Sequence, residues 1–384
     1  MISEYFNPVE LDKPDIDYLA NEYLFCRNIT IHTPDHPVKS LQKYDVALIG
    51  IDRFKTGKKV GNTDAPNLLR SKLYELYKID TKTKIVDLGN FKSGKSVHDI
   101  YFGLRDVLIE LHNHKIVPVI FGGSEDLMYA TLLLQEFLQK SFSFTSVNNK
   151  LNFNLEETDK EISPSSFMNP FFQSPYLFSY SNLGHQACFI SRDQLDFLEE
   201  HNHDSLRLGA IRYNTLIAEP YLRDASVVSV DINSIKHSDA PGQLLVSPNG
   251  FYGEEVCQLS KYAGMSDEVS IFGLSGYHPD KDINHITAAL GAQIIWYFLD
   301  GLTTRKNEKP AENKKNLKKY IVQHKLLDQP LTFYRSIKTD RWWIEVPGKE
   351  KTPLVIACSE DDYQNACNEE IPSRWWKFHQ KINS

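Results

Sequence analysis

The sequence lacks long apolar runs, carries few cysteines and has no excess of basic residues, and each shortage excludes a class of protein. No stretch approaches the roughly 18 consecutive apolar residues of a membrane-spanning helix, so we expect no membrane insertion. The formal net charge is −7. Binding of nucleic acid depends on clustered Lys and Arg, so we expect no nucleic-acid partner.

Little in the sequence points to secretion. The first residues, MISEYFNPVELDKPDID, have no apolar core and carry early acidic residues, unlike a signal peptide. The five cysteines are scattered and odd in number, which is typical of free thiols in a reducing compartment. We therefore expect a cytoplasmic protein.

Short apolar runs alternate with amphipathic segments between residues 44 and 304. The runs predict strands at 46–51, 85–88, 116–121, 142–147, 187–190, 206–211, 227–231 and 269–274. Repeated strand and helix units with short connections favour one mostly parallel sheet covered on both faces by helices. The predicted fold class is therefore α/β.

The two ends of the chain differ from this middle part. Residues 1–43 are polar and contain several prolines, so we expect an N-terminal arm on the domain surface. Residues 305–330 include a Lys- and Asn-rich stretch that is typical of a linker or mobile segment. Residues 331–384 predict a β-meander, with strands at 331–337, 341–346 and 353–357, followed by a short helical tail.

Polar side chains follow two of the predicted strands. Asp231 and Asn233 lie two residues apart, so both point to the same face at the end of a strand. Glu125 and Asp126 follow another strand and a glycine pair. Because open α/β sheets bind ligands at the carboxyl ends of their strands, we expect the functional site here.

Six segments together resemble the ureohydrolase family, which includes arginase, agmatinase and formimidoylglutamase, and formimidoylglutamase most of all. They are GNTDAPNLLR, VPVIFGGSED, SVNNKLNFNL, SVDINSIKHSDAPG, SPNGFYGEE and GYHPDKD, within residues 44–301. The resemblance implies a three-layer α/β/α fold, trimers or hexamers, and two manganese ions held by six side chains. The ions would activate a hydroxide that attacks an amidine or guanidine carbon.

The six ligand positions implied by the resemblance fall on Glu125, Lys150, Asn152, Asn154, Asp231 and Asn233. Asp231 matches the family, and Glu125 is an acceptable substitute. The asparagines are weak neutral donors, and the Lys150 ammonium has no lone pair to offer a cation. A substrate-contacting glutamate of the family falls on Gly276. We therefore interpret the chain as a pseudoenzyme with a degenerate metal site and no cofactor.

Other readings of these residues remain open. Glu125 and Asp231 could be satisfied by backbone N–H groups or by Lys150, whose charge would then stand where the family places metal. Asp126 is either a helix cap, which we favour, or a displaced ligand. If activity survives, the chain is an amidinohydrolase with a reduced or displaced manganese site, and His278 is the candidate general acid.

Two further groups of residues could serve in binding. His201 and His203 have a spacing that suits zinc, but they follow a charged helix end and are typical of a solvated surface. Tryptophans cluster in the C-terminal segment, at Trp342, Trp343, Trp375 and Trp376. Aromatic residues dominate binding hot spots, so we predict a protein-binding or scaffold module that meets its partner through this segment. The alternatives are that the tryptophans form the core of the segment and that the chain assembles with itself.

Overall fold

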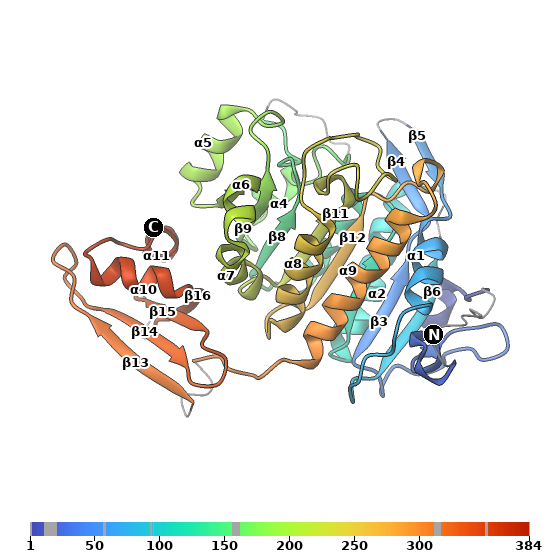
Figure 1. The fold of residues 1–384 in the computed structure, drawn as a ribbon, viewed down its shortest axis with the longest axis horizontal. Coiled ribbons are helices and arrows are strands. Elements are labelled where there is room, and N and C mark those ends of the chain that lie inside the picture. Colours follow the sequence, from blue (N-terminus) through green and yellow to red (C-terminus); the bar gives the residue numbers. More distant parts are fainter. Residues whose placement is uncertain are drawn as a thin grey trace.

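The computed structural model describes residues 2–10, 21–56, 59–92, 94, 96–155, 162–310, 316–349 and 352–383. A ten-stranded sheet forms its centre, in the order β1-β6-β3-β7-β12-β11-β8-β9-β10, with β2 also paired to β6 (Figure 1). The strands pair in parallel, except that β1 is antiparallel to β6. The predicted α/β fold with a mostly parallel sheet is confirmed.

The sheet strands are β1 Phe6–Asn7, β2 Thr30–Ile31, β3 Val46–Gly50, β6 Ile85–Phe91, β7 Val117–Phe121, β8 Phe142–Val147, β9 Leu177–His185, β10 Asp204–Arg207, β11 Val227–Asp231 and β12 Ile271–Ser275; β4 Arg53–Thr56 and β5 Lys59–Asn62 form a separate hairpin. The α-helices of this part are α1 Ala65–Tyr74, α2 Val97–Asn113, α3 Tyr129–Leu138, α4 Asn169–Gln173, α5 Arg192–Glu200, α6 Leu208–Tyr213, α7 Glu219–Arg223, α8 Gly253–Met265 and α9 Ile286–Thr303. The 3₁₀ turns are η1 Ile2–Tyr5, η2 Asn21–Tyr23, η3 Phe25–Arg27, η4 Glu125–Met128, η5 Thr215–Ala218, η6 Ile232–Ser234 and η7 Pro279–Lys281.

Two hydrophobic layers cover the two faces of the sheet. One layer contains the buried side chains of α1, α8 and α9, and the other contains those of α2 and α3. Continuous apolar strands such as β3 and β11 are buried throughout because helices cover both of their faces. Helix α9 is long and apolar enough to cross a membrane, but half of it is buried in the protein and it packs on α1 and α8.

The strand prediction was wrong in two places. Residues 187–190 form a turn, and the strand is β9, just before it. The predicted strand at 206–211 is mostly helix α6, because a short apolar run does not distinguish a buried strand from a buried helix. The predicted N-terminal arm also contributes β1 and β2 to the sheet.

The chain continues into a second, antiparallel sheet of four strands, which with two helices we call the C-terminal unit (residues 316–383 as described). Its elements are β13 Leu317–Val322, β14 Leu331–Ser336, β15 Trp342–Val346, β16 Leu354–Cys358, α10 Glu360–Cys367 and α11 Ser373–Asn383. Strand β13 lies within the stretch predicted as a linker. Figure 1 shows this unit, in orange to red, beside the α7 and β9 side of the larger part.

Candidate functional site

The site is built where β8 and β11 end side by side. Ser229 pairs with Ser146 across the two strands, so their side chains share a face of the sheet. Two residues further along each strand, Asn148 and Asp231 point to that same face. Turn η4, which follows β7, contacts β11 and β12 and places Glu125 against this cluster.

The carboxylate of Glu125 is buried and accepts four hydrogen bonds. Its Oε1 accepts from the hydroxyls of Ser146 (3.2 Å) and Ser229 (3.0 Å). Its Oε2 accepts from the amides of Asn148 (2.6 Å) and Asn152 (2.5 Å). A carboxylate offers about four lone-pair positions, so the protein's own neutral donors fill those of Glu125.

Asn148 joins the two carboxylates of the site. Its Nδ2 donates to Glu125 and also to Asp231 Oδ2, at 3.2 Å. The other oxygen of Asp231 accepts from the backbone N–H and the side-chain amide of Asn233, at 2.9 and 2.8 Å. The two acids are thus bridged by an amide.

Burial and the proximity of the two acids disfavour a second negative charge. Burial, and then the charge of Asp231, raise the pKa of Glu125 to about 8. Burial also raises the pKa of Asp231, against the opposing effects of hydrogen bonds from Asn233 and Asn148 and of the Lys150 charge. The site therefore disfavours two negative charges at once, and the two carboxyl groups titrate together rather than independently.

Lys150 does not form the predicted ion pair. In the described part of the chain no salt bridge joins it to Glu125 or Asp231, and its ammonium lies over the ring of Phe189, 5.7 Å from the centroid. Its backbone N–H is bound by Asn148 Oδ1 at 3.0 Å. The alternative in which the protein's own groups satisfy Glu125 and Asp231 therefore applies, but the groups are neutral side chains rather than Lys150.

The structure brings together only part of the predicted set. Glu125, Asn152, Asp231 and Asn233 meet, whereas Asn154 is exposed and its backbone pairs with Asn169. Gly276 has a positive φ of 83°, and a Cβ there would lie 2.2 Å from Asp231 Oδ1. A glutamate cannot stand at this position without displacing Asp231.

Three other predictions need correction. Asp126 does not cap a helix; its carboxylate accepts from the hydroxyl of Tyr101, which leaves it engaged away from the pair. Burial lowers the pKa of His278 to about 4, so near neutral pH its imidazole is neutral and keeps only a weakly acidic N–H, which does not suit a general acid. His203 is buried, not solvated, because the C-terminal unit lies over it.

Three of the four tryptophans are also buried. Trp342 and Trp343 point to opposite faces of β15, as alternation requires, yet neither is exposed. Trp343 lies under Arg223 of α7, 4.6 Å from the ring centroid, so its face of the sheet rests on the larger part. Trp375 donates to Glu345 O at 2.8 Å, and only Trp376, 44% exposed, has a large free surface. The predicted partner contact needs an exposed ring, which Trp342, Trp343 and Trp375 do not offer.

Sequence reasoning missed Asn148, Ser146 and Ser229, which hold the two acids. A signal for them was present. Ser229 precedes Asp231 by two residues and Ser146 precedes Asn148 by two, so each pair shares a face of a strand.

A centre of two manganese ions does not fit this donor set. No group of three or more His, Cys, Asp or Glu side chains able to hold a metal occurs among the described residues. Glu125 and Asp231 are the acids present, and hard divalent cations need more carboxylate or imidazole ligands.

Comparison with known proteins gives a consistent result. The model of the Arginase family matches residues 44–300. The formimidoylglutamase of Staphylococcus haemolyticus is 21% identical over 269 residues, which cover 67% of this chain and 86% of that protein. The formimidoylglutamase of Bacillus subtilis is 23% identical over 249 residues, or 60% of this chain and 72% of that protein.

Solved structures show the same fold. Trypanosoma cruzi formiminoglutamase with Mn²⁺ superposes with a TM-score of 0.66 at 15% identity, covering 74% of this chain and 99% of that one. The crystal structure of B. subtilis formimidoylglutamase gives 0.65 at 16% identity, covering 77% and 97%. The C-terminal unit lies beyond residue 300, where the match to the family model ends.

These structures correct one prediction. We expected no cofactor, whereas the T. cruzi protein was solved with Mn²⁺. Manganese is thus the ion found in structures of this fold, and it belongs in any test of this chain.

Proposed function

Because the chain belongs to the Arginase family, as residues 44–300 show, we propose that it is a non-catalytic member whose pocket is closed by its own side chains. The predicted ureohydrolase identity is confirmed, and the curated relatives are formimidoylglutamases. The observation that supports loss of catalysis is the saturation of Glu125 by four neutral donors.

The hydrogen bonds around Glu125 and Asp231 explain why asparagines can stand where the resemblance places metal ligands. A buried carboxylate without partners is costly, so a site that loses its family ligands must satisfy the acids that remain. Asn148 and Asn152 do this for Glu125, and Asn233 does it for Asp231. Asn152 and Asn233 stand where the resemblance places metal ligands, and their amides donate to the two acids instead.

A hydrolysis assay tests the proposal. Wild type and Asp231→Asn are each supplied with Mn²⁺ and assayed on formimidoylglutamate, agmatine and arginine, with the B. subtilis enzyme as the positive control. We expect both proteins to show the rate of buffer alone. A wild-type rate that depends on Mn²⁺ and falls in Asp231→Asn would establish the alternative, an amidinohydrolase with a reduced metal site.

A role in protein binding rests on the surface of the C-terminal unit. Trp376 is the tryptophan left partly free, and Ile321, Leu326 and Ile337 of the same unit are also exposed. We propose that this surface meets a protein partner or a second copy of the chain, in the cytoplasm. Trp376→Ala should weaken that contact and leave the fold intact; unchanged association by analytical ultracentrifugation and affinity purification would remove Trp376 from the interface.

A further inference from the structure

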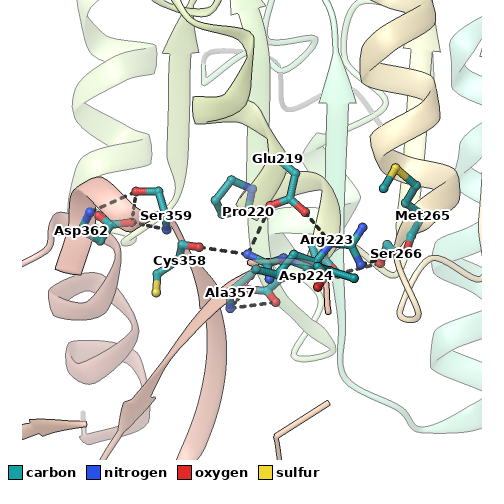
Figure 2. A network of polar contacts seen from close by, with 12 residues as sticks. Glu219, Pro220, Arg223, Asp224, Met265, Ser266, Ala357, Cys358, Ser359 and Asp362 are labelled. Atoms are coloured by element: carbon teal, nitrogen blue, oxygen red, sulfur yellow. Dashed lines mark hydrogen bonds and ion pairs between the residues drawn. The ribbon is translucent and has the colours of Figure 1, made fainter. Parts of the chain in front are cut away.

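A dense set of polar contacts joins the C-terminal unit to α7, and we call it the seam (Figure 2). Asp224, at the end of α7, accepts the backbone N–H of Ala357 at 2.9 Å and an N–H of Arg374 at 2.7 Å. Arg374 also donates to Ala357 O at 2.6 Å and to Pro220 O at 3.1 Å. Of the Arg374 guanidinium, only Nε has no hydrogen-bond partner among the described residues.

Arg223, the residue before Asp224, has fewer hydrogen-bond partners. Its side chain is 95% buried, with a relative exposure of 5%. Its Nη2 donates to Cys358 O at 2.9 Å and lies 3.2 Å from Glu219, as the centre of Figure 2 shows. Its Nε and Nη1 have no hydrogen-bond partner among the described residues. A buried guanidinium with two unused N–H groups indicates a site for an acceptor.

A second guanidinium shares the same carboxylate. Arg341 lies 3.4 Å from Glu219 and donates to Met265 O at 3.3 Å, both long contacts. Burial lowers the pKa of Arg341, and the charge of Arg223 lowers it further, although Glu219 opposes both. The two guanidinium groups therefore share Glu219, and the charges of Asp267 and Glu308 also act on Arg341.

Arg223 and Arg341 line one cavity of about 210 Å³ between the two parts of the chain, with Trp343 in its wall. Most acids on its lining are engaged: Asp224 with Arg374, Glu268 with Lys309, and Glu308 with the hydroxyls of Ser336 and Thr339. Asp267 accepts from the backbone N–H of Glu308, and its other oxygen has no hydrogen-bond partner among the described residues. The acids of the lining, apart from one oxygen of Asp267, are thus engaged, whereas Arg223 keeps two unused N–H groups.

We propose that the seam cavity binds a small oxyanion, a carboxylate or phosphate group, on Arg223 and Arg341. Guanidinium groups are the preferred protein partners of both anions because their planar N–H groups match the oxygen positions. The volume is about seven times the roughly 30 Å³ that one water occupies, which limits the ligand to a small molecule. The free oxygen of Asp267 would favour a ligand that also carries an ammonium group, as glycine does.

The ligand would touch both parts of the chain, Arg223 from α7 and Arg341 beside β15. A ligand that binds only the docked arrangement stabilises that arrangement by mass action. The C-terminal unit would then be held more firmly when the anion is present. This separates the proposal from catalysis, since the seam shares no residue with the Glu125 and Asp231 pair.

Calorimetry and thermal unfolding of the full chain test this. Phosphate, acetate and glycine are titrated separately, with ionic strength held constant by sodium chloride. We expect saturable binding of at least one probe and a saturable rise of a few degrees in Tm. Binding of phosphate alone or of acetate alone identifies the anion, and tighter binding of glycine than of acetate identifies a zwitterion. No saturable binding of any probe would overturn the proposal.

Arg341→Met is the variant of choice, because Arg341 makes only long contacts and its removal leaves the Arg223 bond to Cys358 intact. We expect binding about tenfold weaker or lost, and no ligand-dependent rise in Tm. Arg335→Met, which removes an exposed arginine of the same unit paired with Asp340, is the matched control and should bind like wild type. Equal binding by Arg341→Met and wild type would place the anion elsewhere.

Discussion

The candidate site and the seam both bury carboxylates, but they satisfy them in different ways. At the site, Glu125 and Asp231 are held by amides and hydroxyls, and no salt bridge within the described ranges joins either to a cation. At the seam, Asp224 is held by the guanidinium of Arg374 and by a backbone N–H. The difference shows in protonation, because burial and the neighbouring Asp231 raise the pKa of Glu125 to about 8.

The candidate site and the seam thus differ in whether an opposite charge satisfies their buried acids. The resemblance places metal ions beside the acids of the family site. Here neutral donors contact Glu125 and Asp231 instead. At the seam, ion pairs of Arg341 with Glu219 and of Arg374 with Asp224 join α7 to the C-terminal unit. This unit lies beyond residues 44–300, which the family model matches. Substitutions that break one set of contacts or the other should therefore lower the free energy of unfolding by different amounts.

The largest effect is expected from Arg374→Met. The substitution removes the cation from Asp224 and three hydrogen bonds, of which those to Pro220 and Asp224 cross the seam. Loss of one partner of a buried ion pair costs roughly 3–5 kcal/mol. Urea unfolding should show this loss, and hydrogen exchange should quicken in α11. Arg335→Met, the exposed control, should change little; equal losses in the two variants would mean that the seam contacts do not hold the unit.

Glu125→Leu should come next. It leaves the donors of Ser146, Ser229, Asn148 and Asn152 without their acceptor, and an unsatisfied buried donor costs about 1–3 kcal/mol. Because the four can partly rearrange, we expect a loss of about 3 kcal/mol in urea unfolding. Glu125→Gln keeps an acceptor and should lose less than half as much. If both variants unfold like wild type, the network is not part of the stable structure.

The packing of α11 over His203 should also make the free energy of unfolding depend on pH. Burial, and then the charge of Lys381, lower the pKa of His203 to about 2, whereas the unfolded chain binds the proton near 6.5. This contribution is complete above pH 6.5 and is lost as pH falls below it, because the unfolded state then binds more protons. The free energy of unfolding should fall by up to about 1.4 kcal/mol per pH unit below 6.5.

The measurement is the urea midpoint between pH 7.5 and 5.5. His203→Asn should reduce the slope, since it removes one of the groups that titrate. His185 and His278, whose pKa values burial also lowers to about 4, should keep part of it, and Glu125, whose pKa is raised, opposes it. His201→Asn, two residues earlier and exposed, is the control and should keep the wild-type slope. A slope that persists unchanged in His203→Asn would assign the pH dependence to other groups.

The smallest effect is expected from Lys150→Met. The ammonium lies over Phe189 and makes no salt bridge to the acids of the site in the described structure. A cation–π contact of this kind is worth about 0.5–1 kcal/mol, so the free energy of unfolding should change by less than about 1 kcal/mol. A loss as large as that of Glu125→Leu would show that Lys150 pairs with the carboxylates after all.

Much of the fold was predictable because the apolar runs are short and interrupted by turn residues. The predicted strands at 142–147 and 227–231 coincide with β8 and β11. Strand β9 was missed because its sequence, LFSYSNLGH, mixes polar and apolar residues in a way that resembles a loop. Strand β13 was missed because lysines at 318 and 319 suit a solvated linker as well as an exposed edge strand.

The two acids of the site could be predicted from the sequence, but the side chains that hydrogen-bond to them could not. Glu125 and Asp231 followed from their places after strands, and the family pattern named Asn152 and Asn233. Asn148 could not be ranked above Asn149 from sequence, because only the fold shows which amide reaches both acids. The tryptophans misled for a similar reason: burial of Trp343 depends on Arg223, which is 120 positions away in the sequence.

The central claim is that the protein's own amides occupy the carboxylates of the family site, and a crystal structure at atomic resolution tests it most directly. The account predicts that Asn148 Nδ2 lies within hydrogen-bond distance of both Glu125 and Asp231, near 2.6 and 3.2 Å. An Asn148 side chain turned away, with both carboxylates facing open solvent, would contradict it.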